Sequence, residues 1–141
     1  MFGLDNKSKQ FAEFKRTFLI KESNEIKNFF LKSFSNQGFT DVHLEKWKNV
    51  KRRQEGTKEF KYPKGRGLSR RSKPINTMTG RLRKSITVKS VNEKRLVIGS
   101  VGVDYAGYVN ETRPFMGDSK VLREKIKKKL KAEIDKILKG R

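Results

Sequence analysis

The sequence predicts an α+β fold in which a long N-terminal helix and a C-terminal helix pack on a small antiparallel β-sheet, with a long basic loop or arm. Three observations carry this prediction: apolar residues recur at helical spacing near both ends, β-branched residues alternate after residue 85, and a basic stretch without periodicity precedes them. At 141 residues we expect a single domain. It divides into a helical part (1–50), the arm (51–76), the sheet (77–117) and the last helix (118–141).

The first helix is predicted from Lys9 to about Phe34, because its apolar residues fall mostly three or four positions apart. Ser23 and Asn24 are predicted to fray its middle, and Gly38 to end it. Phenylalanines dominate the stripe. Core packing is the interpretation we favour for them, and an aromatic surface for a partner is the alternative.

The segment that follows the helix contains the single tryptophan and the single histidine of the chain. Trp47 is interpreted as a core anchor. His43 has no second histidine and no cysteine with which to share a metal, so we predict neither a metal site nor a catalytic role for it. The absence of cysteine also excludes disulfides and thiol nucleophiles.

Motifs that carry enzyme chemistry are missing from the sequence. There is no phosphate-binding glycine loop and no dinucleotide fingerprint. Carboxylate pairs occur only at spacings that chance produces in a charged protein, namely Glu22 with Glu25, Glu55 with Glu59, and Asp104 with Glu111. We therefore predict no enzyme, no catalytic residue, no metal and no cofactor; a metal-dependent nuclease with dispersed acidic ligands is the alternative.

Basic residues are concentrated in one third of the chain. The whole chain carries 36 Lys and Arg against 15 Asp and Glu, a net +21, and residues 41–90 alone hold 16 basic and 4 acidic residues. Glycines and prolines break up the stretch from Lys51 to Asn76, which predicts a loop or arm. It is either simply solvated or contacts DNA or an acidic neighbouring subunit. The predicted contact residues are Lys51, Arg52, Arg53, Lys61, Lys64, Arg66, Arg70, Arg71 and Lys73.

Two strands joined by a polar turn are predicted at residues 85–91 and 95–99. They form an antiparallel hairpin with Ile86 and Val88 on one face of the first strand. Alternation continues beyond the hairpin and predicts a third strand, carried by Val101, Val103 and Tyr105.

The last helix is predicted after Pro114, which holds Arg113 in an extended conformation. Asp118 or Ser119 caps it, and an apolar stripe runs from Leu122 at near-helical spacing. Its other faces are rich in lysine, and the stripe packs either on the chain's own sheet or on a neighbour. No apolar run is long enough to span a bilayer and the N-terminus soon becomes polar, so we expect a soluble protein without a signal peptide.

Four short segments follow one another between Thr79 and Met116: Thr-Gly-Arg-Leu-Arg-Lys-Ser-Ile, Val-Ile-Gly-Ser, Tyr-Ala-Gly-Tyr-Val and Arg-Pro-Phe-Met. In order and spacing this set resembles the tail-completion and virion-morphogenesis (neck, head–tail joining) proteins of tailed bacteriophages. There the first segment leads into a hairpin, and the last precedes a C-terminal helix. The residues that carry the resemblance are Thr79, Gly80, Leu82, Arg83, Ser85, Ile86, Tyr105, Ala106, Arg113, Pro114 and Phe115.

These motif residues are interpreted as structural. Gly80 permits a turn that a side chain hinders, and Leu82 and Ile86 supply apolar contacts at the entrance of the sheet. Tyr105 and Phe115 are predicted to close the core.

The resemblance implies a structural protein of the virion, assembled in the cytoplasm of a bacterial host and placed at the head–tail junction. Its partners would be further copies of itself in a ring, neighbouring neck and tail proteins, and packaged DNA, without a membrane. The chain departs from the family in its short segment between Ala106 and Arg113 and in its high basic content at residues 51–73. The alternative function is sequence-nonspecific nucleic-acid binding.

Overall fold

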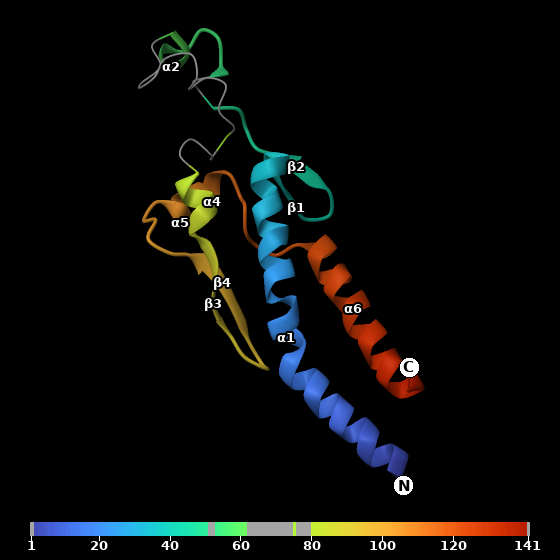
Figure 1. The fold of residues 1–141 in the computed structure, drawn as a ribbon. Coiled ribbons are helices and arrows are strands. Elements are labelled where there is room, and N and C mark those ends of the chain that lie inside the picture. Colours follow the sequence, from blue (N-terminus) through green and yellow to red (C-terminus); the bar gives the residue numbers. More distant parts are fainter. Residues whose placement is uncertain (1, 51–52, 62–74, 76–79, 141) are drawn as a thin grey trace.

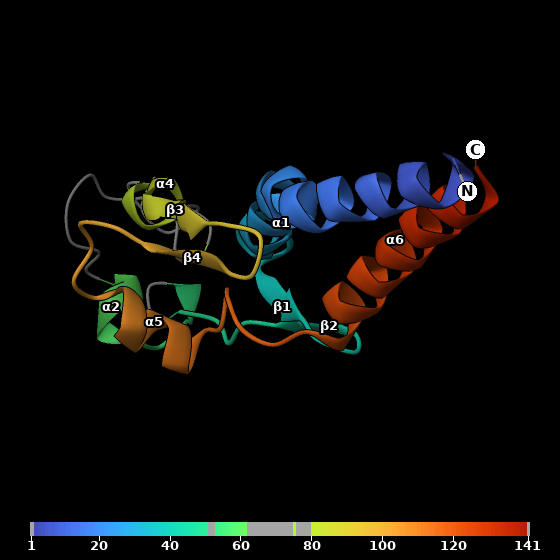
Figure 2. The ribbon, with the colours of Figure 1, turned by 90° about the horizontal axis from the view of Figure 1, so that it is seen from below.

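The structure is a computed structural model that describes residues 2–50, 53–61, 75 and 80–140. One long helix, α1 (Phe2–Asn36), runs through the centre of the fold. A β-hairpin lies on one side of α1 and the C-terminal helix α6 lies on the other (Figures 1 and 2). The α+β class, with long helices at both ends and small antiparallel sheets, is therefore confirmed.

The helix α1 is longer and more regular than the sequence predicts. It begins at Phe2 instead of Lys9 and continues without a break through Ser23. The Ser23 hydroxyl is buried and donates a hydrogen bond of 2.8 Å to the carbonyl oxygen of Ile20, so it is satisfied inside the helix. The predicted fraying at Ser23 and Asn24 is wrong for this reason.

A short antiparallel hairpin follows α1, formed by β1 (Gly38–Thr40) and β2 (Leu44–Lys46). The sequence did not predict it. Gln37 takes the left-handed conformation after the helix, with φ of 55°. Gly38 was predicted to end the helix, but the structure gives another reason for a glycine here. A Cβ at this position would lie 2.3 Å from the Glu45 carbonyl oxygen on β2, so a side chain does not fit between the strands.

The one predicted hairpin is confirmed and is the second in the structure, formed by β3 (Ile86–Val91) and β4 (Leu96–Ser100), which pair antiparallel. Ile86 lies opposite Ser100, and a bulge interrupts the register between Val88 and Ser90. Asn92 closes the turn, since its side-chain oxygen accepts hydrogen bonds from the backbone of Lys94 (2.8 Å) and of Arg95 (2.9 Å). Helix α1 packs against both strands.

No third strand forms where Val101, Val103 and Tyr105 alternate, so that prediction is wrong. Gly102 adopts φ of 74° and turns the chain away from β4. A helix, α5 (Ala106–Thr112), begins soon afterwards. The one-turn helix α4 (Arg81–Ser85), which precedes β3, was also not predicted.

The C-terminal helix α6 (Lys120–Lys139) begins as predicted, with Ser119 as its cap. The Ser119 hydroxyl accepts a hydrogen bond of 3.2 Å from the Leu122 amide. Asp118, the other candidate cap, forms an ion pair of 3.0 Å with Arg123. The helix packs along α1, and α1 in turn packs on the β3–β4 hairpin. Among the described helices, none combines the length and apolar character needed to cross a membrane.

The core lies where the C-terminal half of α1 meets the segments around both hairpins. Phe34 and Phe115 are each only 2% exposed, and their ring centroids are 5.3 Å apart. Trp47 packs against Phe34 at 5.7 Å, which confirms it as a core anchor. The other buried members are Ile75, Leu82, Ile86, Val103 and Ala106.

Most of the predicted basic arm lies outside the described residues, so the structure does not test the arm as a whole. Within its described part, α2 (Lys58–Lys61) is a single helical turn. The Thr57 hydroxyl accepts a hydrogen bond of 3.2 Å from the Phe60 amide at the start of this turn.

Candidate functional site

The structure brings four of the family-motif residues together in one part of the core. Leu82, Ile86, Ala106 and Phe115 are all buried there, as predicted for Leu82, Ile86 and Phe115. Thr79 lies outside the described residues. We call the region from Gly80 to Met116 the motif module.

Gly80 begins the module in the left-handed conformation, with φ of 73°, so the predicted turn is confirmed. A Cβ at this position would meet only the Lys84 side chain, at 3.8 Å, and crowding by neighbours is not the reason for the glycine. Its backbone conformation is the reason, because L-residues adopt it at a cost. The turn directs Leu82 of α4 into the core.

Ser85, at the end of α4, joins that helix to β4. Its hydroxyl lies 2.6 Å from the Ser100 hydroxyl and donates to the Leu82 carbonyl oxygen, also at 2.6 Å. The Ser85 carbonyl oxygen accepts a hydrogen bond of 3.1 Å from the Val101 amide. These bonds fix the end of β4 relative to the turn that begins the module.

Arg81 reinforces the same connection from the surface. Its guanidinium donates a hydrogen bond of 3.0 Å to the carbonyl oxygen of Gly102. The motif arginine Arg83 is exposed, as is Arg81.

Asn110 of α5 holds the Arg-Pro-Phe segment in place. Its side-chain oxygen accepts hydrogen bonds from the backbone amides of Phe115 (2.9 Å) and Met116 (3.0 Å), and its side-chain nitrogen donates to the Met116 carbonyl oxygen at 3.0 Å. Sequence reasoning missed this residue. An asparagine four residues before a Pro-Phe pair was the available signal, because an asparagine side chain can replace backbone partners in a turn.

Three further hydrogen bonds hold the same segment. The Ser33 hydroxyl of α1 donates to the Phe115 carbonyl oxygen at 3.1 Å, and the Trp47 indole donates to the Pro114 carbonyl oxygen at 2.5 Å. The Arg113 guanidinium donates to the Lys48 carbonyl oxygen at 3.2 Å. The Arg-Pro-Phe segment is thus fixed by α1, α5 and the chain after β2.

The tyrosines of α5 and its preceding turn face outward. Tyr105 is 44% exposed, so the prediction that it closes the core is wrong; Ala106 occupies the core at this point. Tyr108 is 71% exposed and lies three residues further along the same helical surface. Tyrosine is enriched at protein–protein interfaces, so this pair is a candidate contact surface.

The predicted contact residues for DNA or an acidic partner are only partly placed. Arg53 and Lys61 are exposed. The remaining members, Lys51, Arg52, Lys64, Arg66, Arg70, Arg71 and Lys73, lie outside the described residues. A second basic surface lies on α6, where Lys120, Lys127, Lys128 and Lys131 are exposed.

Ion pairs join α6 to α1 about midway along α6. Lys129 pairs with Glu22 at 3.0 Å and also with Glu25, and Lys125 lies 3.6 Å from Glu25. Nearer the two termini, the Lys7 ammonium donates to the Leu138 carbonyl oxygen at 2.9 Å. The helices are therefore linked at two places along their length.

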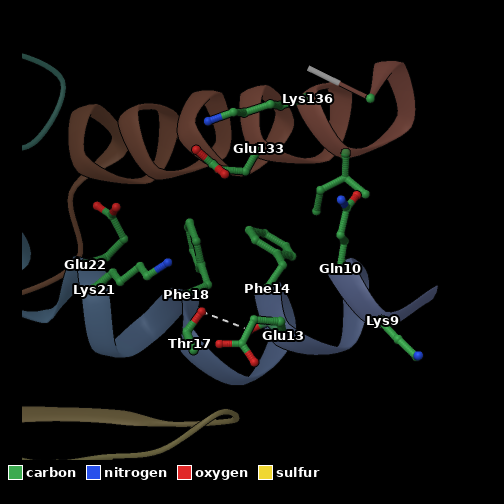
Figure 3. A pocket seen from close by; sticks show the side chains of 12 residues that line it. Lys9, Gln10, Glu13, Phe14, Thr17, Phe18, Lys21, Glu22, Glu133 and Lys136 are labelled. Carbon is green, nitrogen blue, oxygen red and sulfur yellow. Dashed lines mark hydrogen bonds between the residues drawn. The ribbon is translucent and has the colours of Figure 1, made fainter. Parts of the chain in front are cut away.

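Between these links the two helices leave a groove of about 610 Å³. Figure 3 shows the rings of Phe14 and Phe18 pointing from α1 toward α6, with Glu133 and Lys136 on the opposite wall. The ring centroids of the two phenylalanines are 5.2 Å apart. Here the aromatic stripe of α1 lines an opening instead of a closed core.

Among the described residues, no group of three or more histidine, aspartate or glutamate side chains is arranged to hold a metal ion. His43 is exposed in the turn between β1 and β2. No protein-family model, curated protein or solved structure matches the chain. The arrangement of its residues is therefore the basis for assigning a function.

Proposed function

We propose that the chain is a structural virion protein of a tailed bacteriophage, located at the head–tail junction as a tail-completion or neck-ring component, and that it acts by assembly and not by catalysis. The observation that carries the proposal is the ordered motif set. Residues from its separate segments converge on one module, centred on Leu82, Ile86 and Phe115. This convergence supports treating the resemblance as one of structure and not only of short sequence matches.

The hydrogen bonds of the module suit a protein that must present a fixed surface to its neighbours. Asn110, Ser33 and Trp47 bind backbone atoms of the Arg-Pro-Phe segment, so that segment is held from several sides. A pre-organised surface loses little conformational entropy on assembly. Shape, buried apolar area and charge are then the means by which the protein acts.

Further copies of the chain, neighbouring neck and tail proteins and packaged DNA are its partners in this proposal. The exposed Tyr105 and Tyr108 provide apolar contact area for a protein neighbour. The net charge of +21 attracts acidic subunits or DNA. The protein would be assembled in the bacterial cytoplasm and remain in the virion.

Electron microscopy of particles from a phage whose gene for this chain has been deleted tests this role. Full heads beside separate, finished tails are expected for a joining protein. Tails of uncontrolled length, or missing tails, would place the role in tail completion instead. Normal, infectious particles would contradict the proposal.

Sequence-nonspecific nucleic-acid binding is a second candidate, and the exposed lysines of α6 favour it. In such a protein, binding of the isolated chain to DNA should weaken steeply as salt rises. The position of the exposed tyrosines argues against a single-strand stacking platform, because residues 96–112 contain Tyr105 and Tyr108 but no lysine or arginine.

A further inference from the structure

A small hollow lies between the β1–β2 turn and the first turns of α6. It has a volume of about 480 Å³ and an apolar centre formed by Val42 and Val121. Val42 is 61% exposed although it is aliphatic. Around this centre stand Lys120, Glu124, Lys125 and Lys128. We call this feature the valine hollow.

Hydrogen bonds between β1, the turn and α6 keep the valine hollow in shape. The Ser119 hydroxyl donates to the Thr40 carbonyl oxygen at 2.6 Å, and the Val121 amide donates to the Asp41 carbonyl oxygen at 2.9 Å. The Asp41 carboxylate accepts from the Lys120 amide at 2.8 Å. Both valines are therefore held beside each other by backbone contacts that do not depend on an occupant.

The charge around the valine hollow is mainly positive. Lys125 is partly engaged by Glu25, at 3.6 Å. Among the described residues, neither Lys120 nor Lys128 forms an ion pair. Glu124 lies 3.6 Å from Lys127, and the Asp41 carboxylate offsets one positive charge, so Lys120 and Lys128 leave the hollow with a small excess of positive charge. The hollow is suited to an apolar or aromatic group that is accompanied by carboxylates.

A surface of that kind exists on the chain itself. Residues 96–112 carry two acidic residues, Asp104 and Glu111, and no lysine or arginine, in a chain with a net charge of +21. The exposed side chains of this stretch include Val101, Tyr105 and Tyr108. We call this feature, formed by Val101, Asp104, Tyr105, Tyr108 and Glu111, the tyrosine surface.

The two features lie on opposite sides of the molecule. In Figure 1, α5 lies on the left of α1 with the β3–β4 hairpin, whereas β2 and the start of α6 lie on the right; Figure 2 also shows α5 well apart from β2 and the start of α6. One chain therefore cannot join them within itself. A contact between different surfaces of two copies is heterologous and leaves a free surface at each end, so it propagates into a ring or a filament.

We propose that the valine hollow of one copy receives the tyrosine surface of a second copy, and that this head-to-tail contact builds the ring. Burial of Tyr105 and Tyr108 against Val42 and Val121 supplies apolar area, and Asp104 and Glu111 face the lysines. This inference rests on the proposed function, which requires a ring, and assigns the surfaces that form it. DNA is a poorer occupant, because phosphates find no partner at the apolar centre.

Cross-linking tests the contact directly, because the chain contains no cysteine. Two variants, His43→Cys and Gly107→Cys, place a thiol at exposed positions beside Val42 and Tyr108 and leave both of those side chains intact. They are prepared separately and treated with a short bis-maleimide at high protein concentration. A mixture of the two should give covalent dimers that neither gives alone, and the double variant should give a ladder of oligomers. The proposal would be overturned if either single variant gave as many covalent dimers as the mixture. It would also be overturned if the mixture gave no cross-links at all.

Charge reversal provides the matched control. Lys120→Glu with Lys128→Glu should weaken association in sedimentation experiments about tenfold. Lys15→Glu with Lys131→Glu makes the same change in net charge at exposed positions outside both surfaces and should leave association unchanged. Adding Asp104→Lys and Glu111→Lys to the first pair should restore it. The proposed contact would be overturned if both pairs of charge reversals weakened association equally. It would also be overturned if the first pair reduced DNA binding and left self-association unchanged.

The two proposals fail in different experiments. If cross-linking fails while a phage lacking the gene still makes unjoined heads and tails, the head–tail role stands and the assigned surfaces are wrong. If cross-linking succeeds and the phage lacking the gene is infectious, the contact stands and the head–tail role is wrong.

Discussion

The indole nitrogen of Trp47 donates a hydrogen bond of 2.5 Å to the carbonyl oxygen of Pro114, 67 residues further along the chain. This bond joins the segment after β2 to the segment that precedes α6. Because Phe34 packs against both Trp47 and Phe115, the bond also closes the aromatic centre of the core. Two residues of the Arg-Pro-Phe segment, Pro114 and Phe115, are therefore joined to the aromatic centre of the core.

Trp47→Phe tests this bond. The variant keeps an aromatic ring in the core but leaves the Pro114 carbonyl oxygen without its donor, so the free energy of unfolding should fall by about 1–3 kcal/mol. Urea unfolding followed by circular dichroism measures the change. Tyr105→Phe, which removes a hydroxyl from an exposed ring, is the control and should leave the unfolding midpoint unchanged. An unchanged free energy of unfolding in Trp47→Phe would contradict the assigned role of the bond.

Asn110→Ala removes the side chain that binds the backbone of Phe115 and Met116. We expect a loss of about 1–3 kcal/mol, because several partly buried backbone groups lose their partner together. Asn110→Asp retains the acceptor oxygen and loses only the donor, so it should be less destabilising than Asn110→Ala. The same urea experiment compares them, and an equal loss in both variants would show that the acceptor is unimportant.

Two glycines should respond to alanine in opposite directions. Gly80→Ala forces an L-residue into φ of 73° and should destabilise the protein by about 1–2 kcal/mol. Gly107 lies within α5, where a Cβ meets nothing, so Gly107→Ala should stabilise it by about 0.5 kcal/mol. Thermal unfolding measures whether each substitution raises or lowers the melting temperature. A stabilising Gly80→Ala would contradict the left-handed turn at the start of the motif module.

Glu25→Gln removes the carboxylate that Lys125 and Lys129 share. These side chains are partly exposed, so the expected loss is less than about 1 kcal/mol and should shrink as salt screens the pairs. Unfolding at low and high salt measures the difference. A loss that does not change with salt would show that packing, and not charge, links α1 to α6 at this point.

Periodicity and cap chemistry predicted the elements that depend on local sequence. The β3–β4 hairpin, the Ser119 cap and the burial of Trp47, Leu82, Ile86 and Phe115 follow from alternation, a polar residue before an apolar stripe, and side-chain size. These are properties of neighbouring residues, which a single sequence contains.

The errors arise where backbone conformation or distant contacts decide the structure. Alternation at Val101, Val103 and Tyr105 suggested a strand, but the positive φ of Gly102 turns the chain, and α5 follows. The β1–β2 hairpin is too short to show a pattern. Ser33 became visible as a structural residue only through its bond to the carbonyl oxygen of Phe115, 82 residues further along the chain.

Reconstitution tests the central claim, that the chain acts as a component of the particle, most directly. Cells are infected with a phage that lacks the gene, and purified protein is added to their extracts in increasing amounts. Infectivity and the amount of protein retained in purified particles are then measured. We predict that infectivity rises in proportion to the added protein, saturates at a fixed number of copies per particle, and that those copies stay in the particle. Full rescue by a small fraction of that amount, with no protein in the particles, would contradict the account.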